Sequence, residues 1–376
     1  MATTPKYRDP ETVPAISAYY HAPRLWVGTK PTEKEIKTAL ESELVKDVYR
    51  TDLSQGICVR VRRDGVFVFD CSSWEPGKTT EIPGCDWVGG QPVPKEIIEA
   101  EELAQQRAYK RIQLLTVHLA CLGTAFGGGM RQDLPPQPSS FMTLAHFEQN
   151  DLLTFLDQFA PVESYAFNNL ILTKTDPTCR ILDTFRKRIE VPIEIIESSF
   201  NLLQEILNSS HKNILNLVEL LYKSVHNFTL HQFSESLILC WAVCESLLNT
   251  MWSQYIEEKR AQANKIGMPD NATRINGNRK QRLEGIDFTA SIICEMLELS
   301  DFISYDLFRN LNYIRKARNN WLHSLKDVDI NDAREAIKTT RDFLSLVANI
   351  EINLQVGLTF TARFYSKDMD RLKNWP

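Results

Sequence analysis

The sequence predicts a mostly α-helical protein, in which a helical bundle is preceded by a smaller α/β domain that contains a β-hairpin. Three observations favour this fold class. The chain has 15 glycines among 376 residues, about 4% against a usual level of roughly 7%, and scarce glycine favours long helices over tight turns. Apolar residues recur at helical spacing through most of the second half. The clearest alternation of apolar and polar residues, typical of a strand, lies near residue 60.

Length and composition predict a folded protein of two or three domains, at roughly 100 to 200 residues per domain. Hydrophobic residues make up 43% of the chain and charged residues 24%, as in ordinary globular proteins. We expect an α/β domain over residues 1–180, a helical bundle over residues 185–356 and a C-terminal tail over residues 357–376. The formal charge of −5 disfavours a broadly basic nucleic-acid-binding protein, so any contact with RNA must be local.

A β-hairpin is expected in the first domain. Its first strand alternates apolar Ile57, Val59 and Val61 with Cys58, Arg60 and Arg62, a turn follows at 63–65, and its second strand spans 66–69. The outward arginines could contact an anion. Charged side chains on the outer face of an edge hairpin are more often simply solvated, and we favour that interpretation.

Two helices are expected in the same domain, one over residues 31–45 from its capping pattern and one over residues 94–122 from its apolar spacing. The stretch over residues 112–130 is uncharged if His118 is neutral, but its glycines and polar residues favour a buried helix running into a glycine loop over a membrane span. The glycine-rich segment over residues 123–129 lacks the Gly-Lys-Ser/Thr ending of a phosphate-binding P-loop, and we interpret it as a flexible connection. The Pro-rich stretch 134–140 indicates a linker, and residues 141–180 support no assignment.

The eight cysteines predict reduced thiols in a cytoplasmic protein, because no C-x-x-C pair or suitably spaced histidine indicates a zinc site. Cys240 and Cys244 lie four residues apart in an apolar run and are expected to pack inside the bundle. The opening MATTPKYRDPE has no apolar segment behind a basic start, so we expect no secretory signal. These patterns predict no metal, no cofactor and no membrane association.

From Pro192 onward the sequence predicts one helix after another. The breaks are expected near residues 209–210, 227–229, 266–278 and 327–329. The helix at about 233–259 is apolar nearly all round between Leu237 and Trp252, which indicates a central helix buried by several neighbours.

A second helix of the bundle, over residues 305–326, separates its residues into two faces at 100° per residue. The apolar stripe, expected to face the bundle, contains Leu307, Leu311, Ile314, Trp321 and Leu325, and the polar stripe contains Asn312, Arg315, Asn319 and His323. Arg318 flanks the polar stripe and lies about 140° from His323 on a straight helix. A long arginine can bend across Asn319, so a shared patch is feasible.

The segment RNNWLH, residues 318–323, resembles the R-x(4 to 6)-H motif of the HEPN superfamily of helical-bundle proteins. In that family a polar residue commonly follows the arginine, as Asn319 does, and one more amphipathic helix follows the motif, here from Ala333 to about Ile350. The resemblance covers about 170 of the 376 residues, implies a HEPN-like bundle of four or five helices, and does not extend to the first half. Arg111 and His118 satisfy the looser spacing, but we treat that pair as a coincidence because isoleucine follows the arginine.

The resemblance implies RNA cleavage, in which the ribose 2′-OH attacks its own 3′-phosphate once a base removes its proton, with no metal required. His323 is the candidate general base or acid because imidazole exchanges its proton near neutral pH. Arg318 would hold the scissile phosphate and stabilise the charge of the transition state, while Asn319 would orient either partner. Relatives in that family bring two motifs together across a dimer, so the resemblance also implies a homodimer with a composite active site.

Two further groups are candidates to support this site. Glu245 lies in the central helix, where a buried carboxylate without a cation would be costly, so we expect it to hold Arg318 or Arg315 unless its side chain reaches the surface. A basic loop over residues 274–282 is a candidate to bind RNA backbone, although ordinary solvation is the slightly favoured interpretation; its cations are Arg274, Arg279, Lys280 and Arg282.

The first hypothesis is therefore a metal-independent endoribonuclease that cleaves single-stranded RNA and leaves 2′,3′-cyclic phosphate ends. The resemblance implies a role in anti-phage defence by abortive infection, or as a toxin, and the first domain would then bind a trigger or an inhibitor. The alternative is a non-catalytic helical binding or scaffold protein that pairs through its bundle, with Arg318 and His323 as surface groups. The RNA substrate and the activating trigger stay open.

Overall fold

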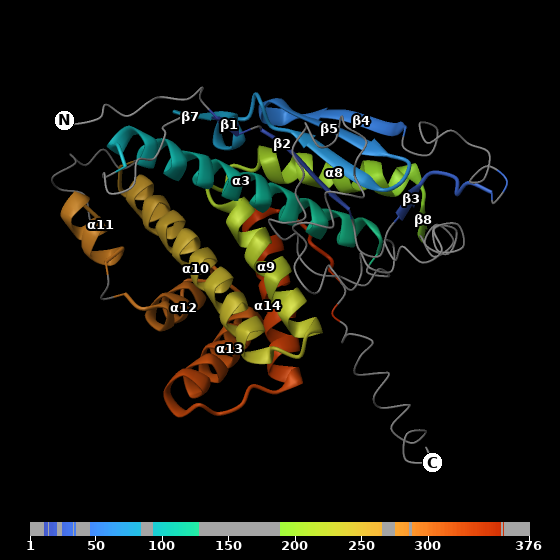
Figure 1. The fold of residues 1–376 in the computed structure, drawn as a ribbon. Helices are drawn as coiled ribbons and strands as arrows, with labels where there is room; N and C mark the ends of the chain where they lie inside the picture. Colours follow the sequence, from blue (N-terminus) through green and yellow to red (C-terminus); the bar gives the residue numbers. More distant parts are fainter. Residues whose placement is uncertain are drawn as a thin grey trace, which may run out of the picture. The chain divides into compact units, whose positions relative to one another are not determined.

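The fold is mostly helical, with a small sheet region in the N-terminal part, as predicted (Figure 1). The computed structural model describes residues 11–13, 15–20, 25–32, 34, 46–83, 93–127, 189–264, 275–285, 288–354 and 356. The chain divides into two compact units, and the main division falls between Asn208 and Ser209.

The β part of the first unit is built from short strands. Its largest sheet is antiparallel in the order β2-β6-β5-β4, with strands β2 (Ile16–Tyr20), β4 (Asp47–Leu53), β5 (Ile57–Arg62) and β6 (Val66–Asp70). The smaller pairs are β1 (Glu11–Val13) with β7 (Thr80–Ile82), antiparallel, and β3 (Leu25–Val27) with β8 (Ile189–Val191), parallel. Short 3₁₀ turns span Ser54–Gly56 and Glu75–Gly77.

The predicted hairpin is confirmed as β5 and β6, which pair antiparallel around the turn at Gly65, a residue with φ of 83°. Two details were wrong. The hairpin is internal to the sheet, because β2 and β4 flank it on either side. Arg62 does not face solvent, because its side chain is 5% exposed and pairs with Asp64 at 2.9 Å. Arg60 is half-buried and lies 3.6 Å from Asp47.

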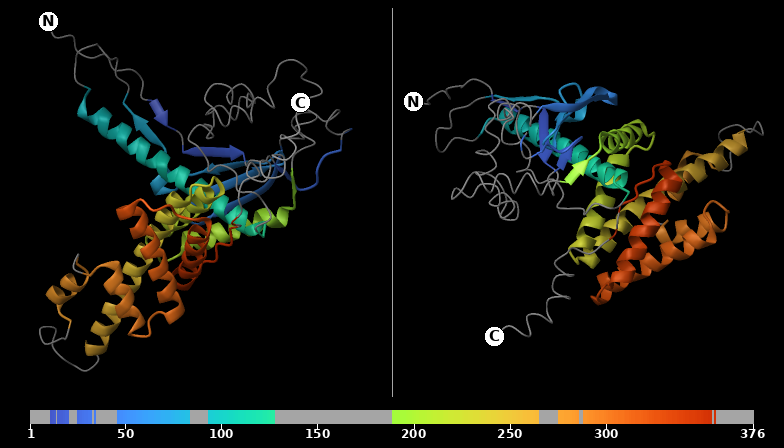
Figure 2. Two further views of the ribbon diagram at one scale, coloured as in Figure 1. Left: turned by 90° about the horizontal axis from the view of Figure 1, so that it is seen from below. Right: turned by 90° about the vertical axis from the view of Figure 1, so that its right-hand side faces the viewer.

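Two helices, α3 (Lys95–Ala125) and α8 (Ile193–Asn208), pack together on one face of this sheet (Figures 1 and 2). An aromatic cluster lies where they meet the sheet. His118 of α3 stacks on Phe200 of α8 with ring centroids 4.2 Å apart, and both rings contact Phe67 and Phe69 of β6. The buried helix expected within residues 112–130 is thus confirmed up to Ala125, and α8 and the sheet together bury it.

The boundary between the units differs from the expected one near residue 185. The sequence predicts that the segment of α8 belongs to the bundle, but this helix packs on α3 and contacts β4. Its Gln204 side chain accepts a hydrogen bond from the Ser54 amide at 2.8 Å, and the carbonyl of Leu207 accepts one from Gln55 at 2.9 Å. The first unit therefore takes in residues up to Asn208.

The second unit is a helical bundle. Its helices are α9 (Ile214–Thr229), α10 (Phe233–Asn264), α11 (Gly277–Leu283), α12 (Ala290–Glu298), α13 (Tyr305–Ser324) and α14 (Ile330–Ala348). The long helix α10 is central, as predicted, because α9, α12, α13 and α14 all pack against it. The expected breaks near residues 209–210, 227–229 and 327–329 fall between helices or at their ends, and residues 266–274 of the remaining expected break lie outside the described residues.

Cys240 and Cys244 are fully buried in the bundle, as predicted. Cys240 Sγ lies 2.9 Å from Ser224 Oγ, and Cys244 Sγ lies 3.3 Å from Thr340 Oγ1 of α14. Burial raises the pKa of the Cys244 thiol to about 12, so this sulfur stays protonated and packs as a small apolar group.

Within the described ranges, no helix has both the length and the apolar character that a membrane crossing requires. Several predictions lie outside the described residues: residues 33 and 35–45 of the expected helix over 31–45, the glycines at 128–129, the linker at 134–140, the unassigned stretch 141–180 and the tail at 357–376.

Candidate functional site

The residues that carry the resemblance lie on α13, which packs against α10, α12 and α14 (Figure 1). Leu311 and Ile314 are buried and anchor the helix, which confirms the centre of the predicted apolar stripe. Leu325 was wrongly placed on that stripe: it is 79% exposed, because it follows the last helical residue and adopts a left-handed conformation with φ of 50°. The second half of the motif therefore lies at a solvent-exposed helix end.

Arg318 bends toward the polar stripe. Its Nη1 donates a hydrogen bond of 2.9 Å to Oδ1 of Asn319, which lies one helical turn before His323 on the same face. The hydrogen bond thus holds the guanidinium beside Asn319, on the side of the helix that carries His323. The acceptor is neutral and, within the described chain, no carboxylate lies within ion-pair distance of Arg318. Its positive charge is therefore not compensated.

His323 lies in the last turn of α13 and is exposed. Among the described residues its side chain forms no hydrogen bond or ion pair, so both ring nitrogens are open to a ligand. The partly buried Arg318, held by an amide, offers donors that suit a phosphate, and the imidazole of His323 is a group that exchanges a proton near neutral pH.

The packing of α13 on α14 is reinforced beside the polar stripe. The hydroxyl of Tyr313 donates a hydrogen bond to Asp332 of α14, and this bond raises the pKa of Tyr313 to about 12. Asp329 caps α14 by accepting hydrogen bonds from the amides of Asn331 and Asp332, at 2.7 and 2.9 Å. These contacts fix the start of α14 against the middle of α13.

The expected pairing of Glu245 with an arginine is not formed. Glu245 is half-buried, and among the described residues neither Arg315 nor Arg318 lies within ion-pair distance of it. Arg315 instead donates to Oδ1 of Asn312 at 3.1 and 3.2 Å. The physical reason is the partial exposure of Glu245, since a carboxylate that reaches water needs no buried cation.

Most of the basic segment expected as a loop over residues 274–282 instead belongs to a short helix, α11 (Gly277–Leu283). Asn276 caps it by accepting a hydrogen bond from the amide of Arg279 at 3.0 Å. Lys280 is neutralised, because it forms an ion pair with Glu257 of α10 and lies 3.8 Å from Glu284. Arg282 is exposed, as is Arg279, and Arg274 lies outside the described residues. The cations of this segment are thus partly used within the fold.

The second Arg–His pair of matching spacing does not form a site. His118 is fully buried: its Nδ1 lies 2.6 Å from the hydroxyl of Tyr19 and its Nε2 lies 3.2 Å from Oγ of Ser199. Arg111 donates instead to the carbonyl of Gly77 at 2.8 Å. His118 connects β2, α3 and α8 in the core, in agreement with our treatment of the pair as a coincidence.

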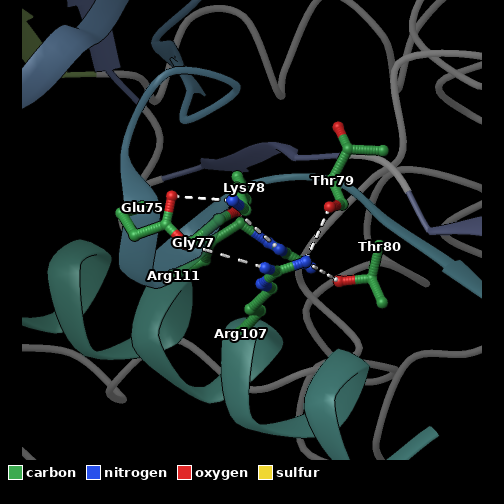
Figure 3. Close-up of polar contacts among 7 residues, drawn as sticks. All are labelled: Glu75, Gly77, Lys78, Thr79, Thr80, Arg107 and Arg111. Carbon is green, nitrogen blue, oxygen red and sulfur yellow. Dashed lines mark hydrogen bonds and ion pairs between the residues drawn. The ribbon is translucent and has the colours of Figure 1, made fainter. Parts of the chain in front are cut away.

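Sequence reasoning missed a basic cluster in the first unit, formed by Arg107 and Arg111 of α3 and Lys78 of the turn before β7 (Figure 3). The available signal was the spacing of the two arginines, four residues apart on one helix face. The Gly-Lys-Thr sequence at residues 77–79 is followed by a strand and not by a helix, so it is not a P-loop.

Searched within the described ranges, the chain brings together no three His, Cys, Asp or Glu side chains that could hold a metal ion. The candidate site on α13 therefore consists of the side chains of Arg318, Asn319 and His323.

Comparison of the chain with models of known protein families, with curated proteins and with solved structures found no match.

Proposed function

We propose that this protein is a metal-independent endoribonuclease of the HEPN type. The observation that carries the proposal is the pose of Arg318: a guanidinium without a carboxylate partner in the described chain, held by Asn319 one turn from an exposed His323. An uncompensated arginine beside a free imidazole suits the cleavage of a phosphodiester, because one group binds the phosphate and the other moves the proton.

In the proposed reaction, Nε2 or Nδ1 of His323 removes the proton from a ribose 2′-OH. The 2′-oxygen then forms a bond to phosphorus, the bond from phosphorus to the 5′-oxygen breaks, and that oxygen leaves as a hydroxyl after it gains a proton. The products are a 2′,3′-cyclic phosphate and a 5′-OH end. Arg318 stabilises the additional negative charge on the phosphate oxygens while these bonds change.

Two protons move on opposite sides of the phosphorus, so one imidazole serves as base while a second group serves as acid. A second copy of the chain would supply that group as its own His323, which makes a homodimer with a composite site part of the proposal. The exposed end of α13, with His323 and Leu322 both open to solvent, is available for such an approach.

The test is cleavage of a 5′-labelled single-stranded RNA by purified protein in EDTA. His323→Ala and Arg318→Ala should each lose roughly 10²- to 10⁴-fold in rate. Lys316→Ala, an exposed cation on the same helix, is the matched control and should cut at the wild-type rate. RNA methylated at every 2′-oxygen should stay intact, and mass spectrometry of the products should find 2′,3′-cyclic phosphate ends.

Expression in bacteria should separate nuclease from binding protein. Wild-type protein is expected to arrest growth, alone or after phage infection, and His323→Ala is expected not to. RNA that stays intact with wild-type protein, both in buffer and in extracts of phage-infected cells, would favour the non-catalytic binding protein. Sedimentation that finds only monomers at micromolar concentration would contradict the composite site.

A further inference from the structure

The turn over residues 75–80 and helix α3 enclose a cluster of cations in the first unit (Figure 3). Arg107 and Arg111 lie one helical turn apart and both point at the turn. Nη1 of Arg107 donates to the carbonyl of Thr79 and to Oγ1 of Thr80, each at 2.8 Å, and Nη1 of Arg111 donates to the carbonyl of Gly77 at 2.8 Å.

The charge of these arginines is poorly compensated. Arg111 is 6% exposed, its one hydrogen bond in the described chain is to a neutral carbonyl, and no described carboxylate lies within 4 Å of it. Burial lowers the pKa of Arg111; the Cys71 thiol opposes this shift, and the neighbouring charge of Arg107 adds to it more weakly. Two like charges thus face one turn inside a partly desolvated site, which is costly unless an anion joins them.

The single carboxylate close to this cluster in the described chain lies at its outer edge. Glu75 bonds to Nζ of Lys78 at 2.7 Å and reaches Arg107 only at 4.0 Å. Its side chain is 77% exposed, so it is free to swing into solvent. With Glu75 in place the four side chains carry a formal charge of +2, and with Glu75 displaced the three cations alone carry +3.

We infer that this cluster binds a phosphate group, with Lys78, Arg107 and Arg111 as its donors. A phosphomonoester or inorganic phosphate carries about −1.5 to −2 charges near neutral pH, which matches the excess charge of the cluster, and three acceptor oxygens, which match its three cations. Glu75 occupies the outer edge when no ligand is bound and competes with it. This inference does not depend on the nuclease proposal, which concerns the second unit.

The turn itself is fixed, as a binding site requires. Gly77 packs so closely that an added Cβ would lie 2.5 Å from Cε3 of the buried Trp74 and 3.1 Å from Cγ of Arg111. Backbone hydrogen bonds from Trp74 N to Cys71 O at 3.0 Å and from Gly77 N to Trp74 O at 2.9 Å close the turn. The donors are therefore positioned before any ligand arrives.

Isothermal titration of the full-length protein with inorganic phosphate and with a nucleoside monophosphate, at constant ionic strength, tests the inference. Wild-type protein should bind phosphate and should not bind chloride. Glu75→Gln should lower the dissociation constant roughly threefold to tenfold, because it removes the internal competitor, and Lys78→Ala should raise it by a similar factor. Both positions are on the surface of the turn, so neither variant should unfold the protein.

Lys95→Ala is the matched control, since Lys95 lies in the first turn of α3, is 84% exposed and pairs only with Glu99 among the described residues. Its dissociation constant should equal that of the wild type. Tighter binding of the nucleoside monophosphate than of phosphate would identify an organic phosphate as the ligand, and equal binding would identify free phosphate. Absence of binding, or binding that Glu75→Gln and Lys78→Ala leave unchanged, would overturn the inference, whatever the outcome of the RNA cleavage assay.

Discussion

The bundle should become less stable as the pH is lowered, because it buries one histidine. His226 on α9 is 7% exposed, and its Nδ1 has no hydrogen-bond partner in the described part of the chain. Burial lowers the pKa of this histidine from 6.5 to about 4. The folded protein thus binds the proton less tightly than the unfolded chain does, so the stability contributed by neutral His226 is complete above pH 6.5 and is lost as the pH falls toward 4.

The size of the effect follows from the two pKa values. At pH 5 the unfolded chain is mostly protonated at this position and the folded protein is not, which lowers the free energy of unfolding by about 2 kcal/mol relative to pH 7. Below pH 4 the loss levels off at roughly 3 kcal/mol, since about 1.4 kcal/mol corresponds to each pKa unit.

Urea unfolding at pH 7 and pH 5, followed by circular dichroism, measures this difference. His226→Asn keeps a polar side chain and removes the titration, so its loss between the two pH values should be about 2 kcal/mol smaller than that of the wild type. His323→Gln, which removes an exposed histidine of the same unit, should behave as the wild type does. If His226→Asn and the wild type lost the same stability, the buried imidazole would not be the cause.

Two substitutions test the packing of the first unit. Asp64→Asn removes the carboxylate that accepts two hydrogen bonds, of 2.9 and 3.0 Å, from the buried guanidinium of Arg62. It should lower the free energy of unfolding in urea by about 2 to 4 kcal/mol. Replacing both residues with leucine should lower it by less, and an equal loss would contradict the reasoning. Gly77→Ala places a methyl group 2.5 Å from the Trp74 ring and should lower the free energy of unfolding by roughly 1 to 3 kcal/mol. An unchanged melting temperature would show that the turn rearranges to make room for the methyl group.

Much of the fold could be predicted from the sequence where the periodicity is long and regular. Helices α3, α10 and α14 each follow an extended helical pattern, and the β5–β6 hairpin shows strict alternation with a glycine turn. The flanking strands β2 and β4 escaped prediction, because their sequences ISAYY and DVYRTDL mix polar and aromatic residues without clear alternation. The sequence therefore predicts an edge hairpin with an exposed Arg62, whereas the hairpin is internal to the sheet and Arg62 is buried.

The boundary between the units could not be predicted from periodicity. Helix α8 is strongly amphipathic, and an apolar face specifies that a helix packs without specifying what covers it. Its partners are α3, more than sixty residues earlier in the chain, and β4, more than a hundred residues earlier. Only the tertiary contacts of Gln204 and Phe200 place it in the first unit.

For the candidate sites, the sequence specifies which face of a helix a charge occupies, but not whether another group neutralises it. Lys280 and Arg111 both occur in basic stretches, yet Lys280 is paired with Glu257 across two helices while Arg111 meets only a carbonyl in the described chain. Arg318 resembles Arg111 in this respect, because its acceptor is a neutral amide oxygen and not a carboxylate. Because a neutral acceptor fixes the orientation of a guanidinium and leaves its charge in place, such arginines are better candidates for binding phosphate than a paired cation such as Lys280 of α11.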